Sequence, residues 1–189
     1  AAGRDGPRQD GGMSGSTRTD WSLRLARPGD ADAMPAIERA AARKFLADPD
    51  LADLDPNDTW TPDNLRGLIR KGHCLVSEAD GCLVGFLASE PFRRELHVWE
   101  MDVHPDYQRR GIGAGLVRAA QIDARNSGFR ALTLTTFRDL AWNAPFYARL
   151  GFEEVTALDA HPRLAGELAN EADNGLPAER RCAMICFLD

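Results

Sequence analysis

A short glycine-containing loop stands between a strand pattern and a helix pattern near the middle of the chain. Its residues are Gln108-Arg109-Arg110-Gly111-Ile112-Gly113. The start of a helix leaves backbone N–H groups without partners and carries partial positive charge. Glycines remove side chains there, so that a phosphate can approach the backbone closely. Taken alone, the loop predicts either an anion site or a glycine-containing helix start without a ligand.

Two common phosphate-binding motifs do not fit this loop. The three-glycine spacing and the acidic residue of the dinucleotide-binding fingerprint are missing. The Gly-Lys-Ser/Thr sequence of a Walker loop is missing as well. Arg109 and Arg110 add mobile positive charge beside the glycines. The loop therefore indicates another kind of phosphate site, which its neighbours in the sequence have to define.

Hydrophobic periodicity predicts a mixed α/β domain around the loop. Strands are expected at 22–26, 74–78, 82–89, 96–103, 131–136, 152–158 and 181–188. Helices are expected at about 30–45, 61–71, 111–127 and 142–150, with a short helix or irregular insert at 162–174. Hairpins combined with helical crossovers imply a mixed central sheet of about seven strands with helices on both faces.

The amino-acid composition is that of a globular protein. The 189 residues are 43% hydrophobic and 28% charged, which suits one globular domain, here 21–189, after a disordered tail over 1–20. The formal net charge of −6 argues against nucleic acid as the main partner, because a polyanion requires a basic face. Neither a bilayer-spanning apolar run nor the apolar core of a signal peptide is present. We therefore expect a cytoplasmic protein without a membrane partner.

The four cysteines lie in apolar, strand-like stretches. They are Cys74, Cys82, Cys182 and Cys186, and no pair of them has the spacing of a zinc site. We interpret them as buried free thiols in a reducing compartment. The sequence predicts no metal site.

Three segments in order resemble the GCN5-related N-acetyltransferase (GNAT) superfamily. Gln108, Gly111 and Gly113 fill that family's acyl-CoA loop, Gln/Arg-x-x-Gly-x-Gly/Ala. The preceding 101–105 segment is similar to the family's central strand and its exit, and the segments 133–136 and 142–152 are similar to its second half-site. The resemblance covers about residues 22–188.

The resemblance implies a splayed sheet that holds acetyl-CoA. A V-shaped opening is expected between strands 97–103 and 131–136, with pantetheine bonded to the main chain near Met101 and Val103. Asn143 matches the family's amide side chain near the pantetheine, although it also suits a helix N-cap. The pyrophosphate is expected on the backbone amides of Arg109, Arg110, Gly111, Ile112, Gly113 and Ala114, beside Gln108.

The resemblance further implies direct transfer of the acetyl group from acetyl-CoA to a primary amine of a small molecule or a protein. The alternative is a non-catalytic acyl-CoA-binding sensor or regulatory module. Family members often pair, so the resemblance allows a homodimer. Tyr147 matches the family's usual proton donor to the leaving thiolate, and its alternative is a ring packed in the core.

The proton acceptor has two candidates, His97 and Glu100, besides a base from elsewhere. Strand alternation places His97, Trp99, Met101 and Val103 on one face, and Val98, Glu100 and Asp102 on the other. A bulge in this strand would re-aim Glu100. Trp60 and Trp99 are candidates for the wall of an acceptor pocket, or plain packing residues.

Overall fold

A seven-stranded sheet forms the centre of the computed structural model, which describes residues 20–189. The predicted tail over 1–20 lies outside the described residues, apart from Asp20. The strands lie in the order β1-β2-β3-β4-β5-β7-β6, and only β4 and β5 are parallel neighbours. Their bounds are β1 (Trp21–Leu25), β2 (Leu75–Ala79), β3 (Cys82–Phe92), β4 (Glu95–Val103), β5 (Ala131–Phe137), β6 (Glu153–Glu154) and β7 (Arg181–Phe187). The mixed sheet is confirmed, while the strand expected at 152–158 is reduced to two residues.

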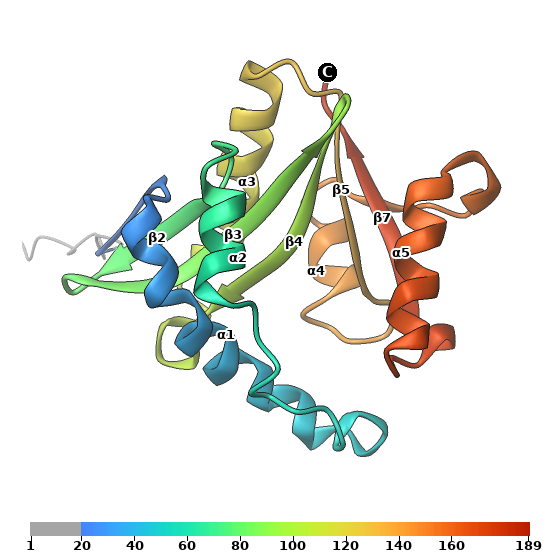
Figure 1. Cartoon of the computed structure of the whole chain (residues 1–189), viewed down its shortest axis with the longest axis horizontal. Helices are drawn as coiled ribbons and strands as arrows, with labels where there is room; N and C mark the ends of the chain where they lie inside the picture. Colours follow the sequence, from blue (N-terminus) through green and yellow to red (C-terminus); the bar gives the residue numbers. More distant parts are fainter. Residues whose placement is uncertain (1–19) are drawn as a thin grey trace, which may run out of the picture.

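Helices cover both faces of this sheet, as predicted (Figure 1). They are α1 (Met34–Ala42), α2 (Pro62–Ile69), α3 (Ile112–Asn126), α4 (Ala144–Ala148) and α5 (Pro162–Asp173). The larger core cluster joins the sheet to α3 and α4, and a second cluster joins it to α1 and α2 on the other face. The single helix expected at 30–45 is divided, because α1 is flanked by 3₁₀ turns at Pro28–Asp32 and Arg43–Ala47.

The sheet splits between β4 and β5. These strands pair only at Glu95–Ala131, Leu96–Leu132 and His97–Thr133, and beyond these pairs they diverge. Figure 1 shows the two strands meeting at one end and spreading toward the other. Among residues 20–189, no strand pairs with the second half of β4 on its β5 side. The V-shaped opening implied by the family resemblance is therefore present.

A bulge in β4 reverses the direction of its side chains halfway along. Ala88 of β3 lies opposite Glu100, whereas the next residue, Ser89, lies opposite Val98, so Trp99 is the extra residue. Val98 packs in the same core cluster as Met101 and Val103. The expectation that Met101 and Val103 share a face with His97 and Trp99 is therefore wrong, because it assumed uninterrupted alternation.

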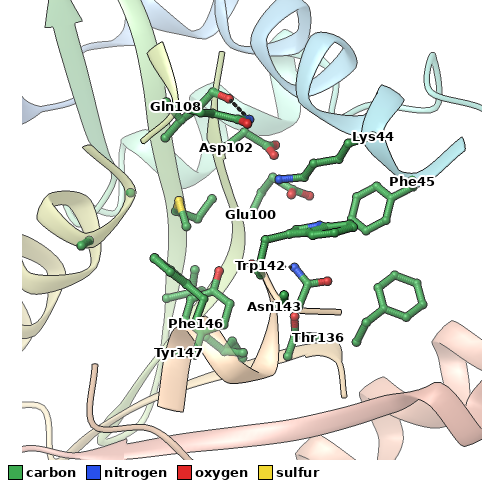
Figure 2. Close-up of a pocket in the computed structure, with 18 of the residues that line it drawn as sticks. Lys44, Phe45, Glu100, Asp102, Gln108, Thr136, Trp142, Asn143, Phe146 and Tyr147 are labelled. Atoms are coloured by element: carbon green, nitrogen blue, oxygen red, sulfur yellow. Dashed lines mark hydrogen bonds between the residues drawn. The ribbon is translucent and has the colours of Figure 1, made fainter. Parts of the chain in front are cut away.

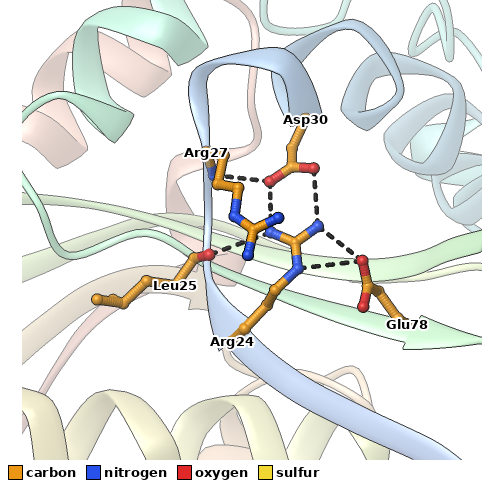
Figure 3. A network of polar contacts seen from close by, with 5 residues as sticks. All are labelled: Arg24, Leu25, Arg27, Asp30 and Glu78. Atoms are coloured by element: carbon orange, nitrogen blue, oxygen red, sulfur yellow. Dashed lines mark hydrogen bonds and ion pairs between the residues drawn. The ribbon is translucent and has the colours of Figure 1, made fainter.

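Arg24 of β1 anchors the edge of the sheet to the turn that leads into α1 (Figure 3). Its guanidinium donates to both carboxylate oxygens of Asp30, at 2.7 and 3.0 Å, and to Glu78 of β2 at 2.7 and 3.0 Å. Asp30 also accepts a hydrogen bond from the backbone N–H of Arg27 at 2.6 Å. The neighbouring guanidinium lowers the pKa of Asp30 below its usual value.

The cysteines are buried free thiols at three of their four positions. All four cysteines are free, and Cys74, Cys182 and Cys186 are buried. The expectation is wrong for Cys82, which is exposed because it is the first residue of β3, directly after the hairpin turn.

Among residues 20–189, no helix is both long and apolar enough to cross a membrane. In the same residues, no cluster of three His, Cys, Asp or Glu side chains has a metal-binding arrangement.

Candidate active site

A cavity of about 870 Å³ lies in the opening between β4 and β5. Its walls come from the second half of β4, the loop before α3, the end of β5, the start of α4, and the segments around 44–45 and 171–181. Most of the predicted site residues line it, namely Glu100, Met101, Val103, Gln108, Arg109, Gly111, Ile112, Gly113, Ala114, Asn143 and Tyr147. Two predicted residues, His97 and Arg110, are not part of the lining.

Two residues of the loop before α3 have left-handed backbone conformations. Arg109 and Gly111 have positive φ angles of 62° and 83°, and α3 begins immediately afterwards at Ile112. Gln108 Nε2 donates to the carbonyl of Val103 at 3.0 Å, which fixes the loop to the end of β4. The amides of the first helical turn at 112–114 have no partner within the helix, and these three residues line the cavity.

The loop is also supported from behind by Trp21. Its indole Nε1 donates to the carbonyl of Arg110 at 3.1 Å. A Cβ atom on Gly115 would lie 2.6 Å from the Trp21 ring, so this close packing requires glycine there. Arg110 does not line the cavity, and its guanidinium lies 4.8 Å from the centre of the ring of Tyr107, which does.

Asn143 precedes the first residue of α4, but its side chain makes no capping hydrogen bond. Its Nδ2 donates to the carbonyl of Trp142 at 3.1 Å. Figure 2 shows the amide directed into the cavity, between Trp142 and Thr136. This arrangement does not support the alternative that Asn143 serves as a side-chain N-cap.

Two carboxyl groups of β4 face a lysine across the cavity. Figure 2 shows Lys44 reaching from the α1 side toward Glu100 and Asp102. Burial raises the pKa of Glu100, and burial together with Glu100 and the nearby Glu38 raises the pKa of Asp102 well above its usual value. Burial lowers the pKa of Lys44, which Asp102 partly opposes. The two carboxyl groups therefore keep their protons to a higher pH, and the lysine loses its proton at a lower pH, than the same groups in water.

One carboxyl oxygen of Asp102 lacks a hydrogen-bond partner in this cluster. Its Oδ2 atom is buried and has no hydrogen-bond partner among the described residues. Glu38 of α1 lies behind the pair, where burial and then Glu100 raise its pKa to about 8. One oxygen of Glu38 accepts a hydrogen bond from the backbone N–H of Trp60 at 3.1 Å.

Tyr147 of α4 packs its ring in the core, while its predicted role as proton donor stays a prediction. Its ring packs against Phe146 and Phe152, with ring centres 5.1 and 5.5 Å away. Its hydroxyl points into the cavity in Figure 2. Burial, followed by the charges of Glu100 and Asp102, raises the pKa of this phenol, which therefore stays protonated over the neutral range.

His97 lies deeper than the cavity, at the point where β4 and β5 still pair. The side chain is 1% exposed, and its Nδ1 is 2.9 Å from the hydroxyl of Thr133. Burial, together with Arg163 and His161, lowers the pKa of His97 to about 3. The imidazole is therefore neutral and enclosed, without contact to the cavity.

The structure adds residues that the sequence did not single out as catalytic. Asp102 shares a face with Glu100, and the spacing of two residues was a usable signal for it. Lys44 and Phe45 come from a distant segment without a local motif. Trp99 lines the cavity, whereas Trp60 packs behind it with ring centres 6.0 Å apart.

Comparisons with known proteins agree with this geometry. The model of the acetyltransferase (GNAT) family matches residues 36–152. Streptothricin acetyltransferase of Streptomyces lavendulae is 30% identical over 161 residues, which cover 74% of this chain and 85% of that protein. A GNAT family acetyltransferase from Brucella melitensis, solved in complex with acetyl-CoA, is 25% identical with a TM-score of 0.54, over 70% of this chain and 82% of that one. PaiA N-acetyltransferase of Thermoplasma acidophilum, solved with coenzyme A, shares the fold at 16% identity, with a TM-score of 0.65 over 88% of this chain and 98% of that one.

The splayed sheet, the glycine loop at the start of α3 and the cavity between them define an acyltransferase of the acetyl-CoA-dependent N-acetyltransferase class. The chain belongs to the acetyltransferase (GNAT) family.

Proposed function

We propose that this protein transfers the acetyl group of acetyl-CoA directly to a primary amine, with Glu100 as proton acceptor and Tyr147 as proton donor. One observation carries the proposal: a single cavity is lined by the residues of the first turn of α3, by the carboxyl-bearing Glu100 and by the buried phenol of Tyr147. The first feature suits a pyrophosphate, and the other two suit proton transfer at a thioester.

The backbone supplies most of the proposed cofactor contacts. Beyond His97, β5 no longer pairs with β4, so the main chain near Met101 and Val103 can accept an extended pantetheine arm, although the Val103 carbonyl already accepts a hydrogen bond from Gln108. The amides of residues 109–114 would hold the pyrophosphate, and the Asn143 side chain would contact the pantetheine amides. Structures of relatives with coenzyme A or acetyl-CoA support this use of the cavity.

The proposed reaction has no covalent enzyme intermediate. The neutral amine attacks the thioester carbonyl carbon, the C–S bond breaks, and the acetyl group becomes an amide. The amine gives a proton to Glu100, and the departing thiolate takes one from Tyr147. The raised pKa of Glu100 makes it a stronger base than an ordinary carboxylate, while His97, with a pKa of about 3 and no contact with the cavity, is poorly suited to this role.

Replacing each candidate base tests this assignment. We expect Glu100→Gln to lower kcat/KM for the amine by about 10²- to 10⁴-fold, the usual contribution of general base catalysis. Acetyl-CoA affinity should change little, because the proposed cofactor contacts remain. In the unsubstituted enzyme, kcat/KM should rise with pH through the apparent pKa of the Glu100–Asp102 pair, since the base acts when deprotonated. Thiol release over a pH series on an amine panel measures both effects.

His97→Gln is the matched variant for the rival base. It should keep the pH dependence of the unsubstituted enzyme. Loss of that dependence in His97→Gln, together with its retention in Glu100→Gln, would reverse the assignment. Tight acetyl-CoA binding without thiol release on any amine would instead favour a non-catalytic sensor.

A further inference from the structure

We propose that Lys44 is a modification site: with acetyl-CoA bound, the active site transfers the acetyl group to the Nζ atom of its own Lys44. The step uses the base and the acid proposed above, so it rests on the proposed function and adds an internal acceptor to it. It is carried by the place of Lys44 inside the cavity and by the lack of an ion pair that would hold its ammonium there.

Lys44 lines the same cavity as Glu100 and Tyr147. It lies in the 3₁₀ turn Arg43–Ala47, which follows α1, and Figure 2 shows its amino end directed into the cavity toward Glu100. Its Nζ atom lies 5.2 Å from the centre of the Trp142 ring, two residues before α4. The amine is therefore flanked by the strand that carries the proposed base and by the segment that leads into the helix of the proposed acid.

The backbone at Lys44 is fixed by its neighbour Phe45. The Phe45 ring packs against Phe137 at the end of β5 and against Trp142, with ring centres 5.5 and 6.1 Å away. The four-carbon stem of lysine keeps its rotational freedom, so Nζ can move within the cavity while the backbone stays in place. A nucleophile held in this way reacts in an intramolecular step, without the entropy cost of capturing a separate acceptor.

The charged form of Lys44 is weakly stabilised in this position. Among residues 20–189, Lys71 forms an ion pair with Glu90, whereas Lys44 forms none. Burial lowers the pKa of Lys44, and Asp102 opposes this effect only in part. Because an amine attacks a thioester only in its neutral form, the environment favours the reactive form of this side chain.

The proposed step forms one amide and releases one thiol. Neutral Nζ of Lys44 attacks the thioester carbonyl carbon, a new C–N bond forms and the C–S bond breaks. The nitrogen gives a proton to Glu100, and the departing thiolate of coenzyme A takes one from Tyr147. Exchange with water then restores both groups. The product is an uncharged acetyl-lysine, so each chain undergoes the reaction once.

The sequence makes this modification easy to locate, because lysine occurs only at positions 44 and 71. Lys71 is exposed and does not line the cavity, so it serves as the internal reference. The full chain is incubated with isotopically labelled acetyl-CoA, and labelled peptides are mapped by mass spectrometry. We expect at most one labelled acetyl group at Lys44 of each chain, formed at least about tenfold faster than at Lys71. The label separates new acetyl groups from those acquired during expression.

Two controls separate catalysis from chemical acetylation of a reactive amine. Tyr147→Phe should slow labelling of Lys44 by about 10²-fold or more and leave labelling of Lys71 unchanged. In the unsubstituted protein, excess free coenzyme A should slow labelling of Lys44 alone, because it occupies the proposed cofactor site. The second control keeps the test decisive even where the variant folds poorly.

A mixture of two variants tests whether the transfer is intramolecular. Lys44→Arg keeps the proposed base and acid but lacks the acceptor, whereas Tyr147→Phe keeps the acceptor but lacks the acid. We expect the Tyr147→Phe chain to stay as slowly labelled in the mixture as it is alone. Faster labelling of that chain in the mixture would show transfer between molecules and overturn the internal acceptor.

The remaining outcomes distinguish this modification from the function beneath it. Thiol release on an external amine with Lys44 left unlabelled would overturn the modification, and direct transfer would stand. Labelling of Lys44 that neither Tyr147→Phe nor free coenzyme A slows would be chemical acetylation and would overturn it as well. Absence of label together with absence of thiol release on every amine would contradict direct transfer itself.

Discussion

Tyr147 shows how one side chain serves packing and chemistry through different atoms. The ring is held between Phe146 and Phe152 and is part of the main core cluster. The hydroxyl at its far end reaches the cavity. Phenylalanine preserves the first role and removes the second, so the two can be separated by one substitution.

Tyr147→Phe should therefore lower kcat by about 10²- to 10⁴-fold, the range expected for loss of a general acid. Acetyl-CoA affinity and the thermal unfolding midpoint should stay close to those of the unsubstituted protein. Steady-state thiol release, cofactor titration and thermal unfolding provide the three readouts. Turnover that is unaffected at every pH would show that Tyr147 is not the proton donor.

At the scale of elements, the loop before α3 joins a strained backbone to a helix start. Gly111 has a φ of 83°, which costs a residue with a Cβ atom about 1–2 kcal/mol, although Asn and Asp tolerate it best. Gln108 and Trp21 hold the surrounding backbone in place from two sides. The anion site thus depends on both the left-handed residue and the packing that fixes it.

Gly111→Asp and Gly111→Asn form a matched pair that isolates charge from backbone strain. Both side chains adopt a positive φ with similar ease and have almost the same size. We expect the Asp variant to bind acetyl-CoA about tenfold or more weakly than the Asn variant, because its carboxylate would lie beside the pyrophosphate. Isothermal titration measures the two dissociation constants. Equal affinities would contradict the placement of the pyrophosphate at this loop.

A second prediction at this scale concerns the Arg24 network between β1, β2 and the turn before α1. The two side chains of the Arg24–Asp30 pair are mostly buried, with 23% of the Arg24 side chain and 12% of the Asp30 side chain exposed. We expect Arg24→Met to destabilise the fold by about 1–3 kcal/mol, the range for charged hydrogen bonds that lose a partner. Urea unfolding at neutral pH measures this loss.

The same network gives the stability a defined pH dependence. The pKa of Asp30 is lowered in the folded protein, so its contribution is present above the unfolded pKa of about 3.9 and disappears as the pH falls through the lower folded value. The stability difference between Arg24→Met and the unsubstituted protein should therefore shrink in acid. A difference that stays constant from neutral pH to about pH 2 would show that Asp30 is not its source.

At the scale of the whole molecule, the cavity exists only when the two halves of the sheet are both folded. Lining residues come from β4 and the loop before α3 in one half, and from β5, α4 and β7 in the other. The segment 43–54, which follows α1, packs against the end of β5 at the wide end, where β4 and β5 no longer pair. Ligand binding is consequently coupled to folding of the entire domain.

Acetyl-CoA should therefore stabilise the complete domain rather than a part of it. At a ligand concentration about 100-fold above the dissociation constant, the gain is about 2.7 kcal/mol for a ligand that binds only the folded state. A single unfolding transition that moves to higher temperature with acetyl-CoA is the expected result. An unchanged transition at millimolar acetyl-CoA would contradict the assignment of the cavity to this cofactor.

The local features of the sequence predicted most of the elements. The Asp80-Gly81 turn between apolar runs identified the β2–β3 hairpin, and the periodicity after Gly111 identified α3. The length of a strand that pairs with a segment far away in the chain was predicted less accurately. The strand at 152–158 is limited to Glu153–Glu154, because its pairing with β7 is limited to these two residues.

The sequence by itself determined the chemistry of the loop at 108–113 and the presence of Glu100 and Tyr147, because glycine conformations and side-chain types are properties of single residues. Only the tertiary structure decided which groups share the cavity. The extra residue in β4 reversed its alternation, and the three β4–β5 pairs enclosed His97. The turn after α1 brought Lys44 to the cavity from a distant segment. These outcomes depend on pairing and packing between segments far apart in the chain, which local periodicity does not encode.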